Sequence, residues 1–169
     1  YSIEPVISTL ESEIDIQNCN FSNCYYGGIK SLKKTNLTIF NCIFSMMKAE
    51  EGAAINFNGD SLRIQNCIFI KCNSLKAGGA IKIEERSESH ILNSSFIQNK
   101  SPRGNSIYVS HKNKLFISNC NIPSYSNEIY NELKNNIIVK IGGDDGNHDL
   151  PQDGNEDSTG FTKSNYFTL

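Results

Sequence analysis

The sequence predicts an all-β protein, a parallel β-helix of about five coils followed by an irregular acidic tail. Three observations lead to this fold class: strand-forming apolar residues dominate, one motif returns at nearly regular intervals, and apolar and polar residues alternate within each repeat. Repeats of roughly 20 to 30 residues without a helical segment are typical of β-solenoids, in which each repeat forms one coil. We place the coils in residues 1–142 and the tail in residues 143–169.

The composition favours strands joined by turns. The chain has 169 residues and contains 22 Ile against 10 Leu and 5 Ala, together with 22 Asn and 20 Ser. Isoleucine favours strands, whereas asparagine and serine favour turns, so the composition does not favour a helical bundle. A net charge of −2 gives no reason to expect nucleic acid or an anionic membrane as a partner. No apolar run reaches the roughly 18 residues that a membrane-spanning helix needs.

The repeated motif is Asn-Cys-X-Phe. It begins at Asn18, Asn41 and Asn66, and degenerate copies begin at Asn93 and Asn119. The residues three positions after these asparagines are Phe21, Phe44, Phe69, Phe96 and Ile122. If each asparagine faces inward at a bend, its amide can hydrogen-bond the equivalent amides of neighbouring coils and the bending backbone. We therefore interpret the five asparagines as a structural ladder rather than as a ligand-binding row.

A second apolar column supports the same coil length. Its members are equally spaced along the chain, and they are Ile3, Ile29, Ile55, Ile81 and Ile107, with Leu133 continuing the series. Within a repeat, Leu62-Arg63-Ile64-Gln65 shows the period of two that indicates a strand. Equivalent strands of successive coils would pair about 4.8 Å apart and stack like residues on like. A leucine-rich repeat has a similar period, but it would require several leucines in each repeat.

Two short motifs carry a resemblance to a known family. Gly78-Gly79-Ala80-Ile81 and Phe96-Ile97-Gln98-Asn99 match the GGA(I/L/V) and FxxN hallmarks, and relaxed copies are spread over residues 13–122. The chain therefore resembles the polymorphic membrane proteins, a family of repeat surface proteins. The resemblance implies a right-handed parallel β-helix of the pectate-lyase-like kind and an exposed, adhesive role, and it supplies no catalytic residues. The general chirality of crossover connections favours the same right hand.

Polysaccharide-degrading enzymes share the β-helix, so the residues that their chemistry requires must be considered. Glycoside hydrolysis usually needs two carboxylates about 5 to 10 Å apart. The two outward columns, which contain Asp15 and Lys30, pair no carboxylates on neighbouring coils, and Glu50-Glu51 and Glu84-Glu85 are expected in turns out of register. We predict that the chain is not an enzyme. The alternative is a carbohydrate-active enzyme or a glycan-binding module of pectate-lyase-like fold.

The cysteines and histidines lack the spacing of a metal site. The three histidines, His90, His111 and His148, lie far apart, and no cofactor is predicted. Six cysteines allow 15 pairings. In a secreted protein we expect the bridges Cys19–Cys24 and Cys67–Cys72, each within one coil. The alternative is pairing from coil to coil in the column that Cys19, Cys42 and Cys67 share, because stacked positions about 4.8 Å apart satisfy disulfide geometry.

Two further features bear on the location of the protein. Asn20 and Asn36 begin Asn-X-Ser/Thr triplets, the acceptors of N-glycosylation, and therefore predict an extracellular or cell-surface glycoprotein. The acidic, glycine-rich tail resembles calcium-binding loops, although it does not match the pattern D-x-[DN]-x-[DN]-G. We favour a flexible linker there, and calcium binding at Asp144, Asp145 and Asp149 is the alternative.

The function that these observations predict is a non-enzymatic structural or adhesive module of a longer surface protein or filament. The coil pattern begins at Ile3 with no amphipathic capping segment before it, so the N-terminal coil is expected to expose unpaired strand edges. The expected partners are protein, either further copies that stack on the coil or other subunits of an assembly, and glycans. Nucleic acid and membrane insertion are not expected.

Overall fold

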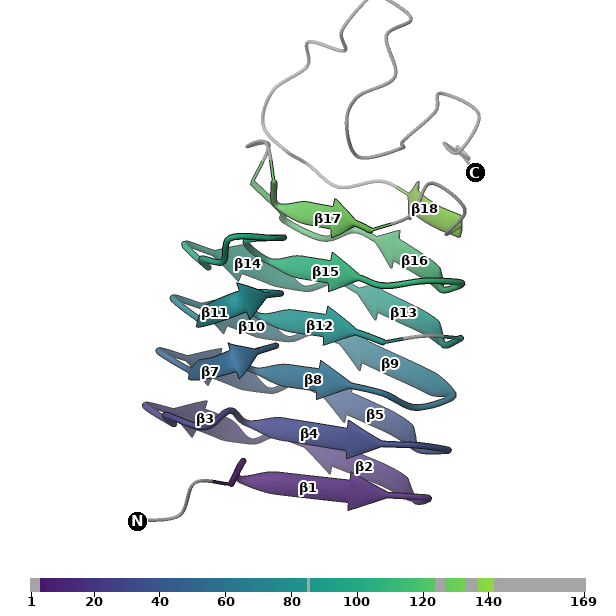
Figure 1. Ribbon diagram of the computed structural model, residues 1–169, viewed down its shortest axis with the longest axis horizontal. Coiled ribbons are helices and arrows are strands. Elements are labelled where there is room, and N and C mark those ends of the chain that lie inside the picture. Colours follow the sequence, from purple (N-terminus) through teal and green to yellow (C-terminus); the bar gives the residue numbers. More distant parts are fainter. Residues whose placement is uncertain (1–3, 85, 124–126, 133–136, 142–169) are drawn as a thin grey trace, which may run out of the picture.

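The structure is a computed structural model that describes residues 4–84, 86–123, 127–132 and 137–141. Its strands wind into a stack of about five coils and pair with the equivalent strands of the coils above and below (Figure 1). Every strand pairing is parallel, and the described residues contain no helix. The predicted parallel β-helix is therefore confirmed.

Four parallel sheets run along the axis of the stack. Sheet A contains β1 (Ile7–Leu10), β4 (Ile29–Leu32), β8 (Ile55–Phe57), β12 (Ile81–Ile83), β15 (Ile107–Val109) and β17 (Ile129–Asn131). Sheet B contains β2 (Glu13–Gln17), β5 (Asn36–Phe40), β9 (Ser61–Gln65), β13 (Glu88–Leu92), β16 (Lys114–Ser118) and β18 (Ile137–Ile141). Sheet C contains β3 (Asn20–Ser22), β6 (Ile43–Ser45), β10 (Ile68–Ile70) and β14 (Ser95–Ile97). Sheet D contains β7 (Lys48–Glu51) and β11 (Asn73–Ala77).

The core consists of like residues stacked on like, as the alternation predicts. In sheet C the rings of Phe21, Phe44, Phe69 and Phe96 stack in turn, with centroids 4.7, 5.2 and 4.8 Å apart. In sheet B one inward position of each strand from β2 to β16 is isoleucine, and the isoleucines at this position in β5, β9, β13 and β16 are completely buried. Burying this apolar surface from all the sheets supplies the main force that holds the coils together.

The predicted isoleucine column is correct in the middle of the stack and wrong at both of its ends. Ile29 pairs with Ile7 in β1, not with Ile3, and Ile107 pairs with Ile129 in β17, not with Leu133. The prediction assumes a constant spacing, whereas the outermost step at each end is shorter than the steps between them. Corners tolerate such deletions because they lie on the surface, while the paired strands hold the register.

The two glycines of Gly78-Gly79-Ala80 are required by the backbone. Gly78 has φ +63°, and a Cβ there would collide with the carbonyl oxygen of Ile81. A Cβ at Gly79 would collide with the carbonyl oxygen of Asn105 in the next coil. The first glycine therefore permits a left-handed corner, and the second permits close contact between coils.

Candidate functional site

The five asparagines of the repeated motif lie at equivalent corners, but their side chains point outward. All five have φ between +47° and +55°, in the left-handed region that asparagine tolerates better than most residues. Their side chains are exposed, so the expected inward orientation is wrong. One hydrogen bond between side-chain amides joins neighbours in this column: Asn41 Nδ2 donates to Asn18 Oδ1 at 2.7 Å. The backbone conformation explains why Asn18, Asn41, Asn66, Asn93 and Asn119 are asparagine.

The residue after each asparagine fills the role that the ladder was expected to fill. These residues form a column of their own, which faces inward in all but the first coil. Its members are Cys19, Cys42, Cys67, Ser94 and Cys120. Its side chains accept backbone N–H groups from the coil below: Cys19 N–H donates to Cys42 Sγ at 3.4 Å, and Cys67 N–H donates to Ser94 Oγ at 3.1 Å. Each bond satisfies a polar group that the corner would otherwise leave unpaired.

A buried asparagine does exist, at the last position of the Phe96-Ile97-Gln98-Asn99 motif. Asn99 Oδ1 accepts the N–H of Cys72 at 3.0 Å, and Asn99 Nδ2 donates to the carbonyl of Phe69 at 3.2 Å. Cys72 occupies the same place one coil below and accepts the N–H of Met47. Cysteine and asparagine therefore fill one structural role, which explains why the relaxed copies of this motif end in cysteine.

All six cysteines are free thiols, and neither predicted within-coil bridge is present. Cys67 and Cys72 are separated by strand β10, and three strand residues alone span about 10 Å. A disulfide requires Cα atoms within about 7 Å, so Cys67–Cys72 is incompatible with this fold, and strand β3 separates Cys19 from Cys24 in the same way. Burial raises the pKa of Cys67 to about 11 and that of Cys72 to about 12, which makes both thiols inert.

A cluster of charges on the outward side of sheet A was missed by the sequence reasoning. Lys82 Nζ lies 2.7 Å from Glu51 Oε2 and also contacts Glu84 Oε1. Lys82 and Glu84 are two residues apart, so a period of two would have placed them on one face. Glu51 comes from β7, across a corner, and no local pattern links it to Lys82. Glu51 was expected in a turn, but it lies in strand β7 and meets Glu84 at Lys82.

A second cluster lies further along the same face. Glu132 Oε2 is 3.0 Å from His111 Nδ1, and its other oxygen is 3.7 Å from Arg103 Nη1. Tyr108 hydrogen-bonds Glu132, and its ring stacks on that of Tyr130 with centroids 5.6 Å apart. The Arg103 guanidinium lies 5.2 Å from the centroid of the Tyr108 ring. Charged and aromatic groups from several coils thus contact one another on this face.

The Lys82 amine in the first cluster and the Tyr108 hydroxyl in the second stay protonated near neutral pH. Burial alone would lower the pKa of Lys82, but its bonds to Glu51 and Glu84 outweigh burial and raise the pKa above the usual range. Burial raises the pKa of Tyr108, and the Glu132 carboxylate raises it further. A general base must be able to give up its own proton near the working pH, so neither Lys82 nor Tyr108 is suited to that role.

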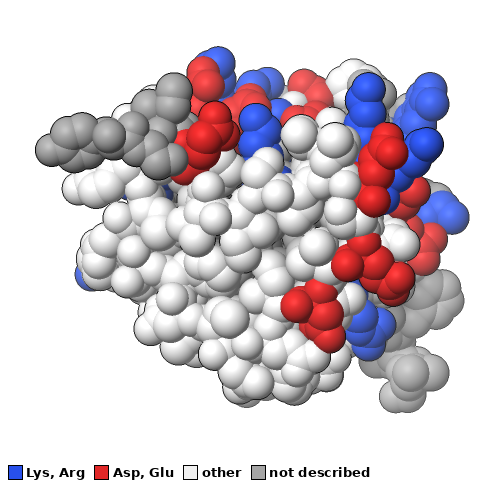
Figure 2. Space-filling model, turned by 90° about the horizontal axis from the view of Figure 1, so that it is seen from below, with Lys and Arg blue, Asp and Glu red and all other residues white. Residues whose placement is uncertain are grey.

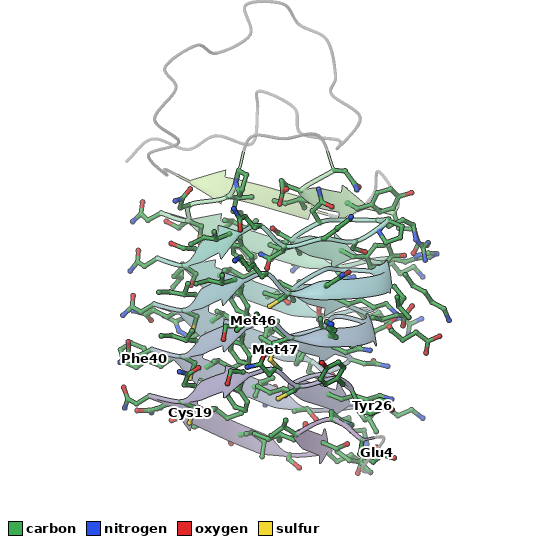
Figure 3. All side chains as sticks on the ribbon, turned by 90° about the vertical axis from the view of Figure 1, so that its left-hand side faces the viewer. Glu4, Cys19, Tyr26, Phe40, Met46 and Met47 are labelled. Carbon is green, nitrogen blue, oxygen red and sulfur yellow. The ribbon has the colours of Figure 1, made fainter. Side chains whose placement is uncertain are left out.

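A groove of about 320 Å³ opens beside the first of these clusters. Residues of several coils line it, among them Glu4, Tyr26, Lys30, Glu51 and Asn56. Glu4 and Tyr26 lie at one edge of the molecule in Figure 3. Tyr26 is 51% exposed, so its ring borders the groove next to side chains of positive and negative charge. The groove has the size and polarity to hold a small polar ligand.

The other predicted sites have simpler outcomes. Asn20 and Asn36 are exposed and therefore accessible to modification. Asp144, Asp145 and Asp149 lie outside the described residues. Within the described ranges, no three His, Cys, Asp or Glu side chains are grouped so that they could hold a metal ion. The same ranges contain no helix that is long and apolar enough to cross a bilayer.

The fold and its surfaces define a parallel β-solenoid with a hydrogen-bonded interior and a polar outer face. Comparison with protein families agrees, because the family described as a right-handed beta helix region matches residues 4–122. The chain belongs to this right-handed β-helix family. The curated proteins contain no match to it, and neither do the solved structures.

Proposed function

We propose that the chain is a non-enzymatic structural or adhesive module of an extracellular or cell-surface protein. The observation that carries this proposal is the pairing of charges on sheet A, where Lys82 is held by Glu51 and Glu84. An acid–base pair that served a reaction would need one partner whose pKa lies near the working pH. The pairing instead supports a rigid outer surface.

The resemblance to the polymorphic membrane proteins supports a surface location. The exposed Asn20 and Asn36 are compatible with N-glycosylation in a secretory pathway. Expression in a secreting eukaryotic host followed by glycosidase treatment tests this part of the proposal. A mobility shift that Asn20→Gln and Asn36→Gln each reduce supports it, whereas a secreted protein without any glycan at either position contradicts the predicted modification.

A glycan-binding module is the second candidate, and the groove beside Lys30 favours it. Exposed Tyr26 offers a ring on which a sugar can stack, while Asn56 and Glu51 offer hydrogen-bonding groups. A glycan array with calcium present, combined with an assay for polysaccharide cleavage, separates the candidates. Binding without cleavage supports adhesion, and weaker binding by Tyr26→Ala assigns it to the groove. Turnover of any polysaccharide contradicts the non-enzymatic proposal.

We further propose that protein partners stack on the lower end of the solenoid. Among the described strands, β1, β2 and β3 pair on one side only and leave their other edges open. Figure 2 shows this end as a broad area without Lys, Arg, Asp or Glu, with charges gathered along the upper and right-hand sides of the view. Unpaired strand edges on a charge-poor face invite another coil of the same kind. Sedimentation should detect self-association that rises with concentration, and a strictly monomeric chain contradicts the stacking proposal.

A further inference from the structure

The lowest coil places an exposed thiol directly beneath a buried one. The strands on either side of Cys19 and Cys42 are in register, since Gln17 pairs with Phe40 and Asn20 pairs with Ile43. Cys19 and Cys42 are therefore stacked one coil apart, about 4.8 Å, within the Cα separation of about 4.4 to 6.8 Å that disulfides accept. Cys42 Sγ accepts the N–H of Cys19 at 3.4 Å, and the Cys19 thiol donates to the carbonyl of Gln17 at 3.1 Å.

Exposure distinguishes this pair from the next one in the same column. Cys19 is exposed at the lower edge of the molecule, where Figure 3 labels it, whereas Cys42 and Cys67 are buried. An oxidant from solution therefore reaches the column at Cys19, and the stacked pair Cys42–Cys67 offers it no entry. The neighbouring column contains no stacked thiols, because Met47 lies between Cys24 and Cys72.

We propose that Cys19 and Cys42 are a redox-sensitive pair that forms a coil-to-coil disulfide with a small disulfide oxidant such as glutathione disulfide. The Cys19 thiolate attacks one sulfur of the oxidant, forms a mixed disulfide and releases one glutathione thiolate, which takes up a proton. The Cys42 thiolate then attacks the Cys19 sulfur and releases the second glutathione. Two protein thiols lose two electrons and two protons, and the oxidant is reduced to two glutathione molecules.

The proposal includes an order of events. Burial, together with the neighbouring Cys19 thiol, raises the pKa of Cys42, so little Cys42 thiolate exists at neutral pH. Attack by Cys42 therefore requires ionisation of a buried thiol, and bridge formation should accelerate as the pH rises from 7 to 9. The bridge ties the first coil to the second and opposes fraying of the open strand edges. Formation of this disulfide does not depend on the proposed adhesive function.

Mass spectrometry of the full chain tests the bridge directly. The protein is incubated with glutathione disulfide, its remaining thiols are alkylated, and it is digested with trypsin. Cleavage after Lys30, Lys34 and Lys48 leaves Cys19 and Cys24 on one peptide and Cys42 on another. We expect these two peptides to be joined with loss of two hydrogens, in the wild type and in the controls Cys24→Ser and Cys67→Ser. Cys19→Ser should abolish the link.

Other outcomes overturn the proposal. These are a bridge within the first peptide, a Cys42–Cys67 bridge, glutathione retained on Cys19 without transfer, or six free thiols after prolonged oxidation. Hydrogen exchange provides a second measurement that needs no cysteine variant to fold. Oxidation should slow exchange in β2 and β3 of the wild type at least several-fold. Equal exchange before and after oxidation of the wild type contradicts the bridge.

Discussion

Asn66 and Cys67 are neighbours at one corner of the middle of the stack, and their side chains serve opposite purposes. Asn66 is exposed and is needed for its backbone conformation, with φ +55°. Cys67 is 1% exposed, and its thiol accepts the N–H of Cys42 and donates to the carbonyl of Gln65 at 3.2 Å. A repeated residue can thus be selected by the backbone alone, while its neighbour is selected by buried hydrogen bonds.

The largest loss of stability is expected at Phe69, which lies two residues after this pair and fills the inward side of the coil. Phe69→Ala removes a fully buried ring that stacks between Phe44 and Phe96, and should lower the free energy of unfolding by about 3 to 5 kcal/mol. Arg63→Ala, on the outward side of β9, should change it by less than about 0.5 kcal/mol. Denaturant unfolding measures both, and similar losses would refute the division into inward and outward sides.

Alkaline pH sharpens the contrast because Cys67 titrates and Asn66 does not. The folded pKa of Cys67, about 11, lies above its ordinary value of 9.0. The contribution of Cys67 to the free energy of unfolding is therefore complete below pH 9. It is lost as the pH rises toward 11, because the thiol ionises at a lower pH in the unfolded chain than in the folded one. The loss should be about 2 to 3 kcal/mol, since one pKa unit corresponds to about 1.4 kcal/mol. Cys67→Ser should lose less stability over this range in urea unfolding, and equal losses would contradict the assignment.

Removing the acceptor at Cys67 tests its bond to the coil below. Cys67→Ala leaves the N–H of Cys42 unpaired in the interior and should lower the free energy of unfolding by about 1 to 3 kcal/mol. Cys67→Ser retains an acceptor, as Ser94 does naturally one coil above, and should cost less. Thermal or denaturant unfolding separates the two variants. If serine is as costly as alanine, packing rather than the hydrogen bond explains the cysteine.

The smallest effect is expected at Asn66 itself. Asn66→Ala places a residue with a Cβ but no local hydrogen-bonding group in the left-handed region, and should cost about 1 kcal/mol. Asn66→Gly should cost close to nothing because glycine adopts this conformation freely. An amide ladder would predict equal losses for both variants, so parallel measurements of unfolding distinguish the backbone explanation from the ladder.

Much of the fold was predictable because the information is local and repeated. The period of two assigned inward positions such as Ile64, and the repetition of phenylalanine assigned the stack in sheet C. The Asn66 error has a definite cause. Strict alternation from Ile64 places Asn66 inward and Cys67 outward, but a left-handed residue at the corner interrupts the alternation. A counting argument that treats a corner as part of a strand therefore exchanges the roles of the two residues.

The charged clusters were beyond the reach of the sequence for a different reason. Glu51 and Lys82 belong to different coils and to different sheets, and the corners between them vary in length. The same variation displaced the isoleucine column at both ends, where Ile7 and Ile129 replace the expected members. The number of a residue predicts its position on the coil only where successive repeats have the same length.

Sequence periodicity alone was sufficient to predict the solenoid, its repeat and its stacked core, because apolar residues recur with the periods of a strand and of a coil. The three-dimensional structure was needed to establish which way each corner residue faces, which thiols are stacked, and which charges meet on sheet A. Those properties depend on left-handed backbone angles and on contacts between coils, and both arise only when consecutive coils are laid on one another.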